Sequence, residues 1–185
     1  MLRKLYGDEH PRVTRALVNL AIVLDAQGRY SEAEPLYRRA LDLSRKLPGE
    51  HQLDTATYAH KLARFYLDQE RYGQATPLLA ESLKLRRRML GPDNPETLLS
   101  LWELATTLIR LGRCEQAEPL ALECYERSKR IYGPAHAETR DAIALLVTLY
   151  ERWGRPEQAT AWRARGQTNT AVVGPDASAS DSDDP

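Results

Sequence analysis

Apolar residues near the start of the chain recur with the spacing of one helical face, i, i+3, i+4 and i+7. They are Val13, Leu17, Leu20, Ala21 and Leu24. A second face of the same kind follows, formed by Ala33, Leu36, Tyr37, Ala40 and Leu41. Residues 27–29, Gln-Gly-Arg, separate the two faces, and glycine ends a helix without a Cβ penalty. The pattern therefore predicts two helices joined by a short turn.

The start of the second helix carries two local signals. Ser31 and Glu34 have the spacing of a capping box, which predicts that the helix begins there. Pro35 then falls in the first turn, where proline costs least. The Gly-Asp-Glu-His-Pro stretch at residues 7–11 breaks the chain before the first helix.

The same pattern recurs along the chain at a period of 42 residues without insertions. One column reads Gly7, Gly49, Gly91 and Gly133, a second reads Ala21, Ala63, Ala105 and Val147, and a third reads Ala33, Ala75, Ala117 and Ala159. No alternation typical of propeller strands is present, so the repeat is helical. HEAT-type repeats remain the structural alternative, although two small residues in each unit, such as Ala21 and Ala33, favour helices that approach closely around a large residue, Tyr37.

Residues 19–21, 27–37 and 90–97 resemble tetratricopeptide repeats of the kinesin light chain type. The resemblance implies an all-α fold, a right-handed solenoid of antiparallel helix pairs that binds peptides or proteins. The predicted units are 7–48, 49–90, 91–132 and a closing unit at 133–165, with turns at residues 27–28, 69–70, 111–112 and 153–154.

The two ends of the chain differ from the units between them. Residues 1–6 align with residues 85–90, 84 positions later, so we interpret them as the tail of a truncated preceding helix. Such a start predicts an exposed apolar face and self-association through the N-terminal unit. Residues 149–159 resemble the closing unit of tetratricopeptide arrays in bacterial serine/threonine kinases. Residues 166–185 contain four Asp and no Lys or Arg, which predicts a disordered acidic tail.

Charge and cysteine content narrow the function classes. The chain has 26 Lys and Arg against 26 Asp and Glu, so nothing indicates binding to nucleic acid or to an anionic membrane. It contains no apolar run long enough for a membrane span and no secretory signal. Two cysteines ten residues apart, Cys114 and Cys124, indicate a reducing compartment, and we predict a cytoplasmic protein.

Motifs for catalysis, cofactors or metals are missing from the sequence. His136-Ala137-Glu138 matches the H-x-E of zinc deaminases, but no P-C-x-x-C follows it. His10, Asn94 and His136 share one column, which favours a role in helix caps over metal binding. We therefore predict no enzyme activity, no cofactor and no metal site.

The candidate binding residues lie on the first helix of each pair, which lines the concave surface in this architecture. The predicted groove residues are Asn19, His60, Lys61, Arg64, Trp102 and Arg110. Other inward positions of the third and fourth units are Leu99, Glu103, Thr106, Asp141, Ala144, Leu145, Thr148 and Arg152. Asn19 is the family-type amide, which both donates to and accepts from a peptide backbone.

The groove residues predict a partner that carries acidic groups and an apolar anchor. Lys61 and Arg64 favour the acidic groups, and Trp102 favours the anchor. A solvated charged face and a core position for Trp102 are the alternatives. The sequence thus predicts a non-catalytic protein-interaction scaffold, with a C-terminal docking array of a larger signalling protein, such as a kinase, as the alternative.

Overall fold

The computed structural model describes residues 10–47 and 49–171. Within these ranges it contains eight α-helices, one 3₁₀ turn (η1, Gly49–His51) and no strand. The helices are α2 (Pro11–Ala26), α3 (Tyr30–Arg45), α4 (Gln52–Leu67), α5 (Tyr72–Leu90), α6 (Pro95–Arg110), α7 (Cys114–Tyr132), α8 (Ala137–Arg152) and α9 (Pro156–Ala171).

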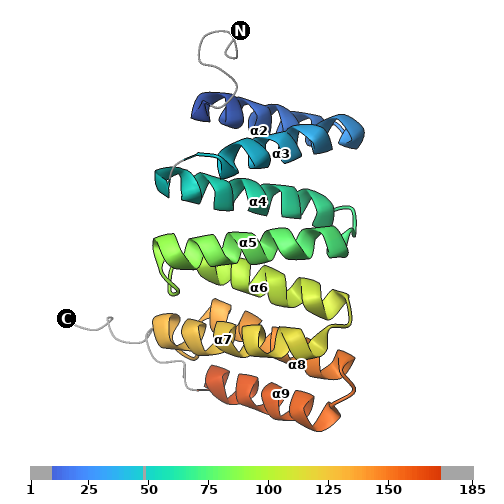
Figure 1. Cartoon of the computed structure of the whole chain (residues 1–185). Helices are drawn as coiled ribbons and strands as arrows, with labels where there is room; N and C mark the ends of the chain where they lie inside the picture. The colour runs from blue at the N-terminus through green and yellow to red at the C-terminus, as the bar shows by residue number, and fades with distance from the viewer. Residues whose placement is uncertain (1–9, 48, 172–185) are drawn as a thin grey trace, which may run out of the picture.

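The helices stack in chain order, each packed on the one before it and the one after it (Figure 1). Among the first helices of the pairs, α6 also contacts α8 directly. The four second helices begin at Tyr30, Tyr72, Cys114 and Pro156, which are 42 positions apart. The prediction of an all-helical solenoid is confirmed.

Small residues occupy the places where the two helices of a pair meet. Side chains in both alanine columns are fully or almost fully buried, namely Ala21, Ala63, Ala105, Ala33, Ala75, Ala117 and Ala159. Buried tyrosines fill the neighbouring space, as Tyr37 does beside Ala33 and Tyr125 beside Ala121. In this core, small alanines therefore allow the helices to approach closely, and large tyrosine side chains fill the space beside them.

The turns inside the pairs lie at the predicted positions, and each contains a residue in the left-handed backbone conformation. Gly28, Gly112 and Gly154 have φ values of +73°, +71° and +72°. At the corresponding point of the second pair, Glu70 adopts φ +57° without being glycine. Its neighbour Arg71 donates its backbone N–H to the carbonyl of Tyr66, as Arg113 does to Leu108, so the turn geometry is kept.

The predicted capping box at Ser31 is wrong. The second helix already begins at Tyr30, and its N-cap, Arg29, makes no side-chain capping bond. Pro35 consequently lies inside the helix, in its second turn and not in its first. The carboxylate of Glu34 instead bonds to groups on the next pair.

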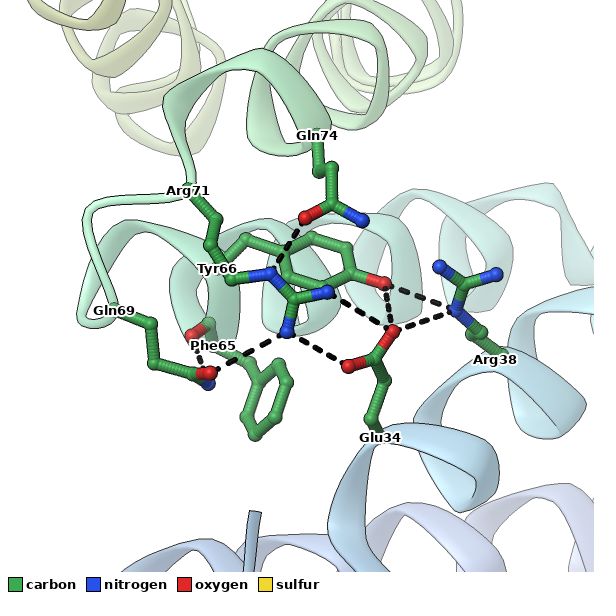
Figure 2. A network of polar contacts seen from close by, with 7 residues as sticks. All are labelled: Glu34, Arg38, Phe65, Tyr66, Gln69, Arg71 and Gln74. Carbon is green, nitrogen blue, oxygen red and sulfur yellow. Dashed lines mark hydrogen bonds and ion pairs between the residues drawn. The ribbon is translucent and has the colours of Figure 1, made fainter. Parts of the chain in front are cut away.

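Figure 2 shows the network that Glu34 joins between the first and second pairs. Its carboxylate accepts hydrogen bonds from Tyr66 (2.9 Å), Arg38 (3.0 Å) and Arg71 (2.7 Å). The Arg71 guanidinium also lies 4.4 Å from the centre of the Tyr66 ring. The last two pairs have a similar contact, in which Tyr150 donates to Glu118 at 2.8 Å. Polar contacts as well as apolar burial thus hold successive pairs in register.

Leu20 is 50% exposed, whereas Leu62, Leu104 and Leu146 in its column are buried. One predicted boundary needs correction. The predicted tail at 166–185 begins too early, because α9 continues to Ala171 and Gly166 lies against Ile143. The predictions for residues 1–6 and 172–185 fall outside the described residues.

Candidate binding groove

Two adjoining cavities lie along α6 and α8, and α7 contributes to the first of them. The first, of about 340 Å³, is lined by Pro95, Leu98, Leu99, Trp102, Cys124, Ser128, Tyr132, Glu138 and Asp141. The second, of about 360 Å³, is lined by Trp102, Thr106, Ile109, Arg110, Asp141, Ala144, Leu145, Thr148 and Arg152. Together they form a continuous hollow, which we call the α6–α8 groove, because Trp102 and Asp141 belong to both. Most of the inward positions predicted for these two units line it.

Trp102 lies at the junction of the two cavities. Its side chain is 38% exposed, unlike the buried residues on either side of it, Leu101 and Glu103. Neighbouring Leu99 is 47% exposed and lines the first cavity as well. The groove therefore presents an uncovered apolar surface, which rules out the alternative that Trp102 is a core residue.

The charged residues of the groove are separated along the helix axes. Arg110 and Arg152 stand in the last turns of α6 and α8 and line the second cavity. Asp141 stands near the start of α8, and Glu138, one turn earlier, pairs with His136. The groove is thus acidic towards the start of α8 and basic towards the helix ends.

His60 and Arg64, two predicted groove residues, are held in an ion-pair cluster between α4 and α6. His60 Nε2 lies 2.5 Å from one carboxylate oxygen of Glu103, and Arg64 donates to the other at 3.1 Å. Burial raises the pKa of Glu103, but the hydrogen bonds and charges of His60 and Arg64 outweigh it, so the pKa lies below its usual value. Of the two cations predicted to favour acidic groups, Arg64 therefore contacts the protein's own carboxylate and Lys61 does not.

Asn19 and Lys61 complete the predicted set and are differently placed. Asn19 is exposed on α2, and Lys61 is half-buried on α4. Neither has a hydrogen bond or ion pair to the described part of the chain. The two residues share one column, which continues into buried Glu103 and buried Leu145, so Asn19 is the only amide of that column.

The role of Glu103 was missed in the sequence, where it was an inward position with no assigned partner. A signal existed, because Glu103 follows His60 by 43 residues and Arg64 by 39, close to the repeat length. Side chains one repeat apart lie on adjacent first helices. The spacing alone does not say whether such a pair forms a contact or faces solvent.

Cys124 is the one cysteine among the residues that line the two cavities. Burial raises the pKa of the Cys124 thiol to about 11, so this residue of the first cavity is not a thiolate at neutral pH. Within residues 10–47 and 49–171, no cluster of three His, Cys, Asp or Glu side chains has the arrangement of a metal site. None of the described helices combines the length and apolar character needed to cross a membrane.

The profile of the tetratricopeptide repeat family matches residues 1–46, 54–127 and 98–162. The chain belongs to this family, whose repeats are generally non-catalytic and point to protein partners. No curated protein matches the chain in sequence.

Solved structures with the same fold include kinesin light chain proteins. A putative kinesin light chain from Podosopora anserina with nearly identical TPR-like repeats has a TM-score of 0.80 at 22% identity, over 93% of this chain and 82% of that one. BtubC (BKLC) from P. vanneervenii has a TM-score of 0.72 at 20% identity, over 95% of this chain and 72% of that one. At these identities the likeness concerns the fold alone.

Proposed function

We propose that the chain is a non-catalytic scaffold that binds a peptide or protein segment in its concave groove. The observation that carries this proposal is the exposed Trp102 side chain at the junction of two adjoining cavities. Aromatic side chains in such positions are the usual anchors of protein interfaces. The alternative of a docking array within a larger signalling protein uses the same groove and gains no separate support.

A selection from a random linear peptide library on the full chain tests this function. Peptides recovered on the wild type should bind Trp102→Ala about tenfold more weakly or worse. Ile131→Ala is a matched control, because Ile131 is also 38% exposed but lies on a second helix, α7. Recovered peptides that bind Trp102→Ala and the wild type equally would place the interface elsewhere.

A second candidate surface is the outer face of α2. Leu20 and Val23 are 50% and 51% exposed, whereas the residues of their columns in later units are buried. We propose that this face mediates self-association of the chain, because two copies that cover it remove apolar surface from water.

We propose a cytoplasmic location. Cys114 and Cys124 are both buried free thiols, as is common in reducing compartments. Fractionation of cells that produce the chain, with detection in the soluble intracellular fraction, is the corresponding test.

A further inference from the structure

Three charged side chains of the α6–α8 groove differ from most arginines of the outer helices in their lack of a partner. Most arginines on the outer helices have carboxylate partners, as Arg45 has Glu81 and Arg87 has Glu123. Asp141, Arg110 and Arg152 have no hydrogen bond or ion pair with any residue the structure describes. Uncompensated charges of both signs therefore flank the exposed Trp102.

These charges stand at a defined separation. Asp141 and Arg152 are eleven residues apart on α8, which corresponds to about 16 Å at 1.5 Å per residue. An extended peptide covers that distance with about five residues. Trp102 shares both cavities with Asp141, so the apolar surface adjoins the acidic end of the groove.

Helix-dipole stabilisation does not account for the basic end. Cations are favoured in the last turn of any helix. The position of Arg110 is nevertheless occupied by Asp68 at the end of α4 and by Ala26 at the end of α2. Arg64, the basic residue in the last turn of α4, is paired with Glu103, so the basic groups without a partner at this end are those of α6 and α8.

We infer that the α6–α8 groove recognises a short linear peptide segment of mixed charge, in a fixed direction. A large apolar side chain lies beside Trp102 and Leu99, a Lys or Arg of the peptide faces Asp141, and a carboxylate about five residues away faces Arg110 and Arg152. The charges set direction and association rate, and the apolar side chain contributes most of the affinity. This inference rests on the proposed function. It replaces the predicted acidic partner with a dipolar one, a peptide that carries a basic residue at one end and an acidic residue at the other.

Charge-swap variants of the full chain test the inference with the same random linear peptide library. Peptides selected on the wild type should carry a basic residue and an acidic residue about five positions apart, with a large apolar residue near the basic one. Asp141→Lys should weaken their binding about tenfold or more. A peptide whose basic residue is replaced by Glu should regain that affinity on Asp141→Lys. The double variant Arg110→Glu, Arg152→Glu should show the reciprocal exchange at the other end.

Two exposed charges outside the groove provide matched controls, Glu126→Lys on α7 and Arg88→Glu at the end of α5. Both should leave peptide binding unchanged at physiological ionic strength, and circular dichroism with thermal unfolding shows whether each variant is folded.

The outcomes separate this inference from the proposed function. Peptides that require Trp102 but show no charge preference, or whose affinity is not regained by the charge swap, would overturn the dipolar assignment and leave groove binding intact. Peptides indifferent to Trp102→Ala, or a selection that yields no binder, would overturn both.

Discussion

The imidazole of His60 on α4 lies 2.5 Å from the carboxylate of Glu103 on α6, so one short contact joins the first helices of two successive pairs. Glu103 is only 4% exposed, and Arg64 of α4 contacts its second oxygen. This cluster couples two units and engages His60 and Arg64 with the protein's own carboxylate. The open charges of the groove consequently lie further along, on α6 and α8.

Acidification should weaken the contact between these units. The pKa of Glu103 is lower in the folded chain than its usual value, so its contribution is complete above the unfolded-state pKa and is lost as the pH falls through the folded-state pKa. At neutral pH, Glu103→Gln should reduce the free energy of unfolding by about 1–2 kcal/mol, since it removes a charged hydrogen-bond acceptor.

Denaturant unfolding at neutral and acid pH measures this effect. The difference between wild type and Glu103→Gln should shrink as the pH falls. Glu126→Gln, an exposed carboxylate on α7, should change little at either pH. A stability difference independent of pH would contradict the assignment.

The hydroxyl of Tyr66 should contribute measurably to the register of the first two pairs (Figure 2). Tyr66→Phe removes its bonds to Glu34 and Arg38 without changing the ring, and should lower the free energy of unfolding by about 1 kcal/mol. Tyr58→Phe is the control, because the Tyr58 hydroxyl has no hydrogen bond to the described residues. Equal unfolding midpoints for the two variants would show that the network is energetically neutral.

Helix pairs and turns could be predicted because each is determined by residues close in sequence. The apolar spacing from Val13 to Leu24 and the glycine at 28 are sufficient for a helix and its end. The repeat adds the buried alanines, since a position that is alanine in successive units is expected to face another helix.

Contacts between units were harder to predict. Leu20 is exposed although the other leucines of its column are buried, so the column alone did not predict the burial of each member. Glu34 had a local partner by motif in Ser31, but the ion pair with Arg71 competes for the same carboxylate. Glu103 was assigned to the groove by its column, yet its distance to His60 follows from how α4 and α6 pack, which the period does not specify.

The turn at Glu70 is a site where stability can be increased. A residue with a side chain is strained at φ +57°, whereas glycine adopts this region freely, as Gly28, Gly112 and Gly154 do in the other turns. Glu70→Gly should therefore raise the free energy of unfolding by about 0.5–1 kcal/mol. Gly112→Ala should lower it by a similar amount. Thermal unfolding in which Glu70→Gly is less stable than wild type would show that the turn is unstrained.

Larger side chains in the alanine columns should lower the stability of the fold. Ala63 and Ala105 are fully buried between helices, and leucine at either position should destabilise the fold by about 1–3 kcal/mol through overpacking. Ala80→Leu is the control, because Ala80 is an exposed alanine in the middle of α5. Unchanged unfolding midpoints for both core variants would remove the argument that helices meet closely at these positions.

The exposed face of α2 should make association depend on concentration. Leu20 and Val23 present apolar surface that Leu62 and Phe65 bury in the next unit, and covering it is favoured by about 25 cal/mol per Å². Sedimentation velocity of the wild type should show a larger species as concentration rises. The double variant Leu20→Ser, Val23→Ser should shift the distribution towards monomer, whereas Ile131→Ser, an equally apolar change on α7, should not. A wild type that stays monomeric across the concentration range would contradict self-association through this face, and equal loss in both variants would assign the contact to another surface.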